Sequence, residues 1–581
     1  MSRRAPRFRV VGMTQDNTAA RRIGTLALVA LWIVLAAPPT AGFAQPPAAG
    51  TSSVRAQVFG NEDLGSYQPL SGDLFGSSFA TGDFNGDGID DLATGIPWDD
   101  GLTGDPLSDC GIVVVRYGIA GRGLAGGLAS TVLSQHAAGG QNPAEAGDNF
   151  GYALAAGDFN GDGIDDLAVG VPGEALPYYD DPSVETVGAG LVQIHYGLPG
   201  GLELVAEHTL AEIWTDEQLG TNSDAQFGAA LAAGDFNGDG YADLAAGSPG
   251  QFASDGQSFV RSGIVKIFLG DAGGLLPAET IWLNQNSPGM NDFPQPGDQF
   301  GSALAAGNFN GDGHVLGSGF VPYDDLAIGV PGEEGMGAVQ VLFGKASLVP
   351  PFDANGIWLQ GEIGDGGVSE AGDHFGASLA VGDFDADGLD DLAIGAPDED
   401  LGASNQFANA GAVGVIYGAP DGAADYFDWA KTDQMDQSTF FGAAANESLD
   451  YFGWALAAGD FDRDGRSDLA IGIPQEDLTG SDEGGVTVTL GGPTGVGESA
   501  FRFVSAGFNG IPGVTQSHRE FGRALATGDF DGNGHADLAI GVPYFNPTVS
   551  LVDAGQEVVL YGSLFADGFE GSSTLYWTPG P

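Results

Sequence analysis

Residues 150–172 read FGYALAAGDFNGDGIDDLAVGVP. Two short apolar runs flank an acidic turn and are bounded by Gly, Asp and Pro, a pattern typical of two β-strands joined by a tight loop. The same arrangement occurs seven times, with Phe-Gly pairs that begin at Phe75, Phe150, Phe227, Phe300, Phe375, Phe452 and Phe521. Successive pairs lie 69 to 77 residues apart, and this regularity predicts one structural unit per repeat.

Each repeat offers four strand-length segments and no sustained helical periodicity. In the second repeat these segments are residues 150–157, 167–171, 191–196 and 209–214. The first segment is rich in Ala and Gly, as a crowded central axis requires. In other repeats the fourth segment contains large side chains, such as Trp282 and Trp358. Seven such units predict an all-β fold, a seven-bladed β-propeller of four-stranded antiparallel blades. An open β-solenoid is the alternative, although its coils are usually shorter than this repeat.

A propeller keeps an exposed strand edge unless its last blade is completed by a strand from the other end of the chain. The seventh repeat supplies three strands, the last of them over residues 558–561. Residues 54–59 and 574–577 compete for the fourth place. We expect the N-terminal segment to fill it, because that strand would tie the first blade to the last.

The 581-residue chain is strongly acidic, with 78 Asp and Glu against 18 Lys and Arg and a formal net charge of −60. Affinity for nucleic acid depends on Lys and Arg that neutralise phosphates, so the composition argues against nucleic acid as a partner. Hydrophobic residues make up 43% of the chain, enough for a large core. Cys110 is the single cysteine, so an internal disulfide cannot form.

The N-terminus has the features of an export signal. Six Arg residues between positions 3 and 22 precede an apolar run over residues 26–37, and Gly42-Phe43-Ala44 resembles a cleavage site. We therefore predict a signal peptide at 1–44, a linker at 45–53 and the propeller over 54–581. The apolar run is shorter than the roughly 20 residues of a spanning helix. We expect a secreted protein, extracellular or periplasmic, without a transmembrane anchor after cleavage; an uncleaved anchor is the alternative.

An acidic loop lies between the first two strands of every repeat, and in the first repeat it is DFNGDGIDD, residues 83–91. Oxygen-bearing side chains occupy loop positions 1, 3, 5 and 9, and Gly at position 6 permits a sharp turn with positive φ. The start of an EF-hand loop is built in this way, with a backbone carbonyl at position 7. The Glu of EF-hand position 12 is replaced by Thr94, so we expect Asp91 at position 9 to supply the closing carboxylate.

The predicted metal ligands are the side chains at positions 1, 3, 5 and 9 and the carbonyl at position 7. They are Asp83, Asn85, Asp87, Ile89 and Asp91; Asp158, Asn160, Asp162, Ile164 and Asp166; Asp235, Asn237, Asp239, Tyr241 and Asp243; Asp383, Asp385, Asp387, Leu389 and Asp391; Asp460, Asp462, Asp464, Arg466 and Asp468; and Asp529, Asp531, Asn533, His535 and Asp537. The fourth loop offers Asn308, Asn310, Asp312 and, after nine inserted residues, Asp325.

All-oxygen ligands without His or Cys predict Ca²⁺, with up to seven ions bound, and argue against Zn²⁺. Mg²⁺ fits less well because it prefers to keep several waters. An Asp-Gly pair also makes ordinary tight turns, but seven copies in one phase favour metal sites. Because more ligand charge usually gives tighter binding, the carboxylate counts predict the tightest binding in the fifth and sixth loops and the weakest in the fourth.

The Phe-Gly pair, the Asp-x-Asn-x-Asp-Gly-x-x-Asp loop and the Gly-x-Pro element together resemble the FG-GAP repeat of integrin α-subunit head domains, which also occurs in exported bacterial proteins. The resemblance covers residues 54–562. It implies a seven-bladed propeller with calcium on the lower face of the blades and a role in adhesion. Integrin-like heads usually carry three or four such loops, whereas all seven repeats have one here.

The sequence contains no His-Glu-x-x-His, Gly-x-Ser-x-Gly or phosphate-binding Gly-Lys-Ser/Thr motif, so we predict a binding or adhesion module for a protein or glycan, not an enzyme. The alternative is a calcium-dependent polysaccharide lyase or glycoside hydrolase. Its carboxylate pair would come from the variable loops after Gly-x-Pro, where binding surfaces are commonly made. The candidates there are Asp99, Asp100, Glu174, Glu333, Glu334, Asp398, Glu399 and Asp400. For each one, a place in a solvated acidic rim is the favoured interpretation.

Overall fold

The structure is a computed structural model of the chain. It describes residues 55–60, 70–101, 108–125, 130–135, 143–177, 185–203, 208–211, 223–254, 259–276, 280–290, 292–316, 319–348, 354–363, 369–402, 405–420, 427–442, 445–497, 501–507, 511–513, 515–548 and 551–562. The chain divides into two units, residues 1–51 and 52–581, and all described residues lie in the second. The predicted signal peptide and the C-terminal candidate strand at 574–577 fall outside the described residues.

Seven four-stranded antiparallel sheets account for most of the described strands. Blade 1 contains β2 (Ser78–Gly82), β3 (Asp91–Ile96), β4 (Ile112–Arg116) and β5 (Thr131–Leu133); blade 2 contains β6 (Leu154–Gly157), β7 (Asp166–Val171), β10 (Leu191–His195) and β11 (His208–Ala211). Blade 3 contains β12 (Ala230–Gly234), β13 (Asp243–Ser248), β16 (Ile264–Phe268) and β17 (Thr280–Leu283); blade 4 contains β18 (Ala303–Gly307), β21 (Asp325–Val330), β22 (Ala338–Leu342) and β23 (Ala354–Trp358). Blade 5 contains β24 (Ser378–Gly382), β25 (Asp391–Ala396), β26 (Ala412–Gly418) and β27 (Phe427–Met435); blade 6 contains β28 (Leu456–Gly459), β29 (Asp468–Ile473), β30 (Gly485–Thr489) and β31 (Phe501–Val504). Blade 7 contains β32 (Leu525–Gly528), β33 (Asp537–Val542), β34 (Gln556–Tyr561) and β1 (Arg55–Phe59).

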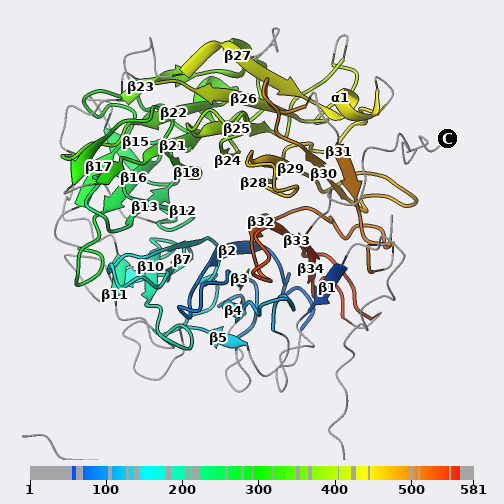
Figure 1. Cartoon of the computed structure of the whole chain (residues 1–581), viewed down its shortest axis with the longest axis horizontal. Helices are drawn as coiled ribbons and strands as arrows, with labels where there is room; N and C mark the ends of the chain where they lie inside the picture. Colours follow the sequence, from blue (N-terminus) through cyan, green and yellow to red (C-terminus); the bar gives the residue numbers. More distant parts are fainter. Residues whose placement is uncertain are drawn as a thin grey trace, which may run out of the picture. The chain divides into compact units, whose positions relative to one another are not determined.

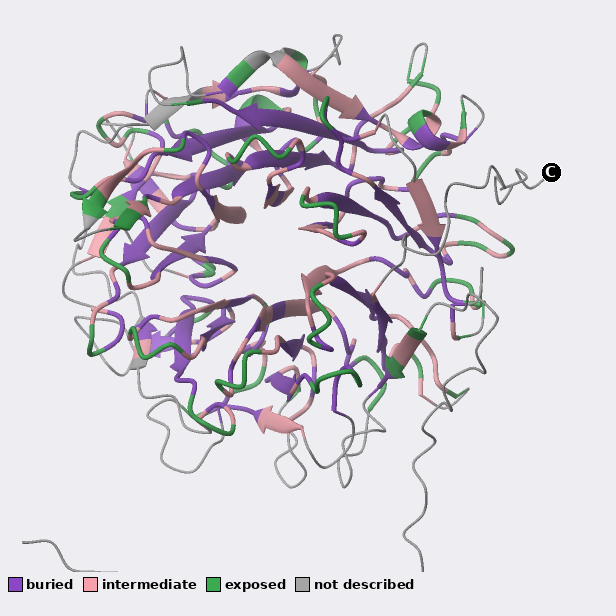
Figure 2. Ribbon diagram, in the orientation of Figure 1, coloured by how far each residue is buried: buried purple, intermediate pink, exposed green. Residues whose placement is uncertain are grey.

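The blades stand in a ring around a central axis (Figure 1), which confirms the predicted propeller. The first strand of each blade contacts the first strands of both neighbours, so that β2, β6, β12, β18, β24, β28 and β32 form a closed circle. The small residues of these strands allow this approach: a Cβ atom added at Gly157 would lie 3.1 Å from the Cβ of Ala233 in the next blade. Burial is greatest in the second and third strands, and the outermost strands are partly exposed (Figure 2).

The Phe-Gly pair lies outside the first strand, so the prediction that this strand begins at Phe150 is wrong. Asn149 and Gly151 have φ values of 58° and 89°, and backbone of this kind cannot continue an extended strand. Phe150 is fully buried, and its N–H donates to the carbonyl of Cys110 in blade 1 over 3.0 Å. The pair therefore fastens each blade to the preceding one. The residue before the Phe has positive φ in all seven repeats, at Leu74, Asn149, Gln226, Gln299, His374, Tyr451 and Glu520.

The last blade is completed by the N-terminal strand. β1 pairs antiparallel with β34, from Arg55 opposite Tyr561 to Phe59 opposite Glu557. The expectation that residues 54–59 close the ring is thus confirmed, with the strand beginning at Arg55. The N-terminal strand and the last repeat thus share a sheet, and the edge of β34 is covered.

The remaining described elements are short and lie in the connections. They are the ribbons β8 (Leu176–Pro177) with β9 (Glu185–Thr186) and β14 (Phe252–Ser254) with β15 (Phe259–Arg261), the hairpin of β19 (Gly313–Leu316) and β20 (Gly319–Pro322), the helix α1 (Gln437–Phe441), and the 3₁₀ turns η3 (Glu333–Gly335) and η4 (Gln360–Glu362). Within the described part of the chain, no helix has the length and apolar character needed to cross a bilayer.

Candidate metal centres

The acidic loops join the first strand of each blade to the second, which places all of them at one end of the blades. The side chain at position 1 organises the turn. In the first loop, Asp83 Oδ1 accepts a hydrogen bond from the Asp87 N–H over 3.0 Å, and Oδ2 accepts one from the Gly88 N–H over 2.7 Å. Gly86 and Gly88 both have positive φ, which explains why glycine stands at positions 4 and 6 of this loop.

The aspartate at position 9 is buried and links two parts of its blade. In blade 1, Asp91 is completely buried and accepts hydrogen bonds from the N–H groups of Phe84 (3.0 Å) and Gly118 (2.8 Å). Corresponding pairs of hydrogen bonds reach Asp166, Asp243, Asp325, Asp391, Asp468 and Asp537. Position 9 therefore has a structural role that the sequence analysis did not include.

Burial also makes these carboxylates costly to ionise. It raises the pKa of Asp91 to about 8, and the nearby charges of Asp83 and Asp87 add to the rise. The pKa of Asp391 is raised to about 8 in the same way, first by burial and then by the charges of Asp385 and Asp383. A cation placed among such carboxylates would reverse this effect, since an opposite charge favours the ionised form.

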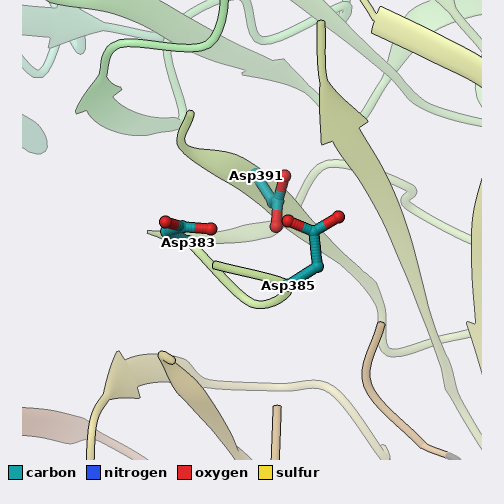
Figure 3. Close-up of side chains that lie close together, drawn as sticks. All are labelled: Asp383, Asp385 and Asp391. Atoms are coloured by element: carbon teal, nitrogen blue, oxygen red, sulfur yellow. The ribbon is translucent and has the colours of Figure 1, made fainter. Parts of the chain in front are cut away.

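Three loops bring carboxylates close enough to share one ion. In loop 5, oxygen atoms of Asp383, Asp385 and Asp391 all lie within 4.8 Å of one another. Figure 3 shows the three carboxylates gathered where the loop meets the start of β25. Two more groups occur, in loop 6 (Asp460, Asp462 and Asp464, at positions 1, 3 and 5) and in loop 7 (Asp529, Asp531 and Asp537, at positions 1, 3 and 9). These are the three loops that have Asp at position 3; the other four have Asn there.

Loop 7 contains a buried side-chain oxygen that a cation could coordinate. Asp531 is only 4% exposed, and its Oδ1 atom has no hydrogen-bond partner among the described residues. A buried polar oxygen without a partner costs free energy. Because this atom belongs to the cluster with Asp529 and Asp537, a hard divalent cation held by all-oxygen ligands suits the group.

The nine-residue insertion of the fourth loop folds as the hairpin β19–β20. The hairpin leaves the end of the loop in place: Asp325 Oδ2 accepts from the Phe309 N–H and Oδ1 from the Gly344 N–H, as in the other blades. At the start of the loop, the Asp312 N–H donates to Asn310 Oδ1 over 2.9 Å. The position-9 aspartate of this loop therefore keeps its hydrogen bonds, and the contact between positions 5 and 3 matches that of loops 2, 3, 5 and 6.

The residues at position 7, predicted to offer a carbonyl, fold back onto position 5. Their backbone N–H groups donate to the side-chain oxygen at that position. The donors are Ile89, Ile164, Tyr241, Leu389, Arg466 and His535. These hydrogen bonds fix the second half of the loop around the position-5 side chain.

Position 8 connects neighbouring loops, a role that the sequence analysis missed. Asp165 Oδ2 in loop 2 accepts from the N–H of Asp83 in loop 1 over 2.9 Å, and the Asp165 N–H donates to the Asp83 carbonyl over 3.1 Å. Asp324 and Asp390 make the same carboxylate contact to the preceding loop. Asp90 makes it to Asp529 and so joins loop 1 to loop 7. An acid at position 8 in these four loops was the available sequence signal.

The acids after Gly-x-Pro lie at the opposite end of the blades, and four of them are not part of a solvated rim. Asp99, Glu174, Glu333 and Glu399 are at most 5% exposed. Glutamines from the preceding blade cover three of them: Gln135 Nε2 donates to Glu174, Gln285 Nε2 to Glu333 and Gln360 Nε2 to Glu399, over 2.5 to 2.8 Å. The expectation of a solvated rim is wrong for these four, and their burial does not suit a carboxylate pair that acts on a polysaccharide.

Comparison with known proteins assigns the repeats. The FG-GAP repeat family matches residues 75–106, 150–195, 227–260, 375–416, 452–489 and 521–560. The chain carries FG-GAP repeats. The six matched FG-GAP stretches fall on blades 1, 2, 3, 5, 6 and 7, and the blade outside them is the fourth, whose acidic loop contains the β19–β20 hairpin.

Relatives of two kinds are similar to the chain. Integrin alpha-PS2 of Drosophila melanogaster is 34% identical over 278 residues, which are 47% of this chain and 16% of that protein. Integrin alpha-PS5 of the same organism is 36% identical over 194 residues, 33% of this chain and 16% of the relative. Phosphatidylinositol-glycan-specific phospholipase D of Rattus norvegicus is 31% identical over 209 residues, 34% of this chain and 21% of the enzyme. The matched region thus spans about a fifth or less of each relative.

Proposed function

We propose that the chain is a secreted calcium-binding propeller that serves as a binding or adhesion module for a protein or glycan. The observation that carries the metal assignment is the repetition of one acidic loop in every blade, with three carboxylate clusters and an unpartnered buried oxygen on Asp531. Side-chain oxygens at positions 1, 3, 5 and 9 and the backbone carbonyl at position 7 would hold the ion, with up to seven ions in the ring. The bound ions would neutralise acids that otherwise repel one another.

The binding role is supported by the architecture. A rigid ring of buried strands carries loops that differ from blade to blade, and such loops commonly form recognition surfaces. The similarity to integrin α subunits points the same way. The proposal favours binding over catalysis because four of the eight candidate acids, Asp99, Glu174, Glu333 and Glu399, are buried.

Calcium titration of the purified protein after treatment with a chelator tests the metal assignment. Saturation tenfold above the dissociation constant stabilises the fold by about 1.4 kcal/mol per site, so seven sites would contribute on the order of 10 kcal/mol. We expect multi-site binding heat and a large rise in melting temperature on adding calcium. An unchanged melting temperature after chelation would contradict the assignment.

The binding role has its own test, a glycan and matrix-protein array probed with and without calcium. Capture that disappears with chelator supports the proposal. A turnover assay on the same polysaccharides runs alongside the array. Release of cleaved product there would overturn the choice of a binding module and favour a lyase or hydrolase.

A further inference from the structure

The three loops with an additional carboxylate at position 3 each receive a basic side chain. Lys431 Nζ pairs with Asp385 of loop 5. Arg466 pairs with Asp464 of loop 6 over 2.6 Å, and Arg55 pairs with Asp531 of loop 7 over 2.5 Å. The chain has only 18 Lys and Arg among 581 residues, so the placement of three of them on these loops calls for a physical reason.

These basic groups are held in place by the fold. Lys431 belongs to β27, and its ammonium lies 4.1 Å from the centre of the Tyr417 ring. Arg55 belongs to the closing strand β1, and its guanidinium lies 4.6 Å from the centre of the Tyr561 ring. Cation–π contacts of this kind favour one position of a long side chain. Arg466 is itself the position-7 residue of its loop.

Each basic group contacts one carboxylate oxygen of its partner Asp and does not contact the other oxygen. Lys431, Arg466 and Arg55 all contact Oδ2. The Oδ1 atoms of Asp385 and Asp464 accept backbone hydrogen bonds from within their loops, and Oδ1 of Asp531 has no hydrogen-bond partner among the described residues. The basic groups therefore offset charge without covering the whole carboxylate.

We propose that Lys431, Arg466 and Arg55 are tethered counter-ions that cancel one negative charge in loops 5, 6 and 7. The inference rests on the proposed metal-binding function. Counted over the ligand positions and these counter-ions alone, loops 5 and 6 then have the same net charge as loops 1 to 3; loop 6 also contains Arg463, whose guanidinium donates to the Asn533 carbonyl of loop 7 over 3.1 Å. Loop 7, with three acids, falls to the level of loop 4 with two. On this proposal, the affinities of loops 5 and 6 are close to those of loops 1 to 3, and net charge replaces carboxylate number as the basis for ranking the loops.

In loop 7 this arrangement couples ion binding to the docking of the closing strand. Arg55 lies on β1, which pairs with β34, and its partner Asp531 is a predicted ligand. A divalent ion in loop 7 and the guanidinium of Arg55 repel one another. Binding of the ion and docking of β1 therefore oppose each other at this loop, and by linkage each weakens the other by the same factor.

Calcium titration by calorimetry of the full chain and of Lys431→Met tests the proposal. Methionine keeps the length and apolar character of the side chain against Tyr417 and removes its charge. One site should bind about tenfold more tightly, the size expected of a unit charge roughly 5 Å from a divalent ion in a water-like dielectric. Lys431→Arg, the matched control, should titrate like the wild type. Lys431→Met combined with Asp385→Asn restores the net charge and should bring the affinity back.

The possible results separate this inference from the metal assignment. If the wild type binds no calcium, the proposed function itself fails. If the wild type binds but Lys431→Met leaves the isotherm unchanged, the counter-ion role is wrong. If Lys431→Met loses a site, the counter-ion role is also wrong, and Lys431 supports its ligand instead. Arg466→Met repeats the test in loop 6, where Arg466 pairs with Asp464.

Discussion

A glutamate is buried at the seam between blades 7 and 1, and another is buried at the junction between blades 1 and 2. The two carboxylates differ in their hydrogen-bond and charge partners. At the seam, Glu557 of β34 is fully buried and receives Arg116 of β4 over 2.7 Å and the Thr94 hydroxyl over 2.6 Å. At the junction, the donor to the Glu174 side chain among the described residues is the neutral amide of Gln135, and the acid Asp148 lies nearby. The seam therefore holds an ion pair, whereas the described part of the junction places acids together with no cation beside them.

The difference follows from how the blades are joined. Blades 1 and 2 are consecutive in the chain, so the connection between them already determines that they are neighbours. A hydrogen bond between neutral glutamine and glutamate is then sufficient at their junction. In blade 7, by contrast, β32, β33 and β34 come from the opposite end of the chain, so non-covalent contacts have to select β1 as their fourth strand and blade 1 as their neighbour. The position of Glu557 in the strand is occupied in the other blades by Val113, Val192, Val265, Val339, Val413 and Val486. We infer that the Arg116–Glu557 pair specifies which blades meet, a role that buried ion pairs have in some proteins.

Removing the closing strand should have the largest effect on the seam. Deletion of residues 51–60 exposes the edge of β34 and removes Phe59, whose ring lies 4.5 Å from the Arg116 guanidinium. We expect a loss on the order of 5 kcal/mol, a large part of the stability of a typical fold, measured by urea unfolding. Deletion of residues 572–581 is the control and should leave the midpoint unchanged. Equal losses in both variants would show that β1 is not the strand that secures the ring.

Breaking the ion pair on one side should come next in size. Arg116→Leu leaves Glu557 buried without its cation, and breaking such a pair typically costs about 3–5 kcal/mol. The double variant Arg116→Leu/Glu557→Val introduces the residues of blade 4 at these positions and should recover most of this loss. Its cost should appear in assembly, as oligomers with exchanged strands on refolding, detected by size-exclusion chromatography. A double variant as unstable as the single one would contradict the comparison.

The sequence was sufficient for the fold and for the closing strand because both depend on local, repeated patterns. The alternation of Phe-Gly, acidic loop and Gly-x-Pro recurs in every blade, and the spacing of residues 54–59 from the first Phe-Gly matches that of other fourth strands. The start of the first strand was misplaced because a Phe between Asn149 and Gly151 looks like a strand residue. Only the backbone shows that both neighbours have positive φ.

Contacts between blades could not be predicted from the sequence. Arg116 and Glu557 are separated by 441 residues and belong to blades 1 and 7. The pair follows no repeat, so only the packing of the blades brings the two residues together. The burial of Glu174 had the same cause, because the Gln135 that covers it belongs to another blade. A charged residue in an otherwise apolar strand, such as Arg116, was the one available signal.

The smallest effect concerns pH and distinguishes the junction from the seam. Burial, followed by the charge of Asp148, raises the pKa of Glu174 from 4.5 to about 8. Between these values the folded state keeps a proton that the unfolded state has released, so the free energy of unfolding decreases as pH rises through this window. Glu174→Gln mimics the protonated acid and should therefore remove part of this decrease, about 1–2 kcal/mol between pH 5.5 and 8.5 once solvent access is allowed for.

The measurement is a series of urea unfolding curves across that pH range at saturating calcium, so that the acids of the metal loops stay ionised and do not contribute. Glu334→Gln, which changes an exposed acid next to the buried Glu333, serves as the matched control and should follow the wild type. Glu174→Gln should instead be more stable than the wild type at pH 8.5 and equal to it near pH 4.5. The reason is that the wild-type side chain is ionised in the folded state only at the higher pH. Parallel wild-type and Glu174→Gln curves would mean that Glu174 is ionised in the folded state throughout this range. Junction and seam would then both hold a charged glutamate, and the contrast between them would be lost.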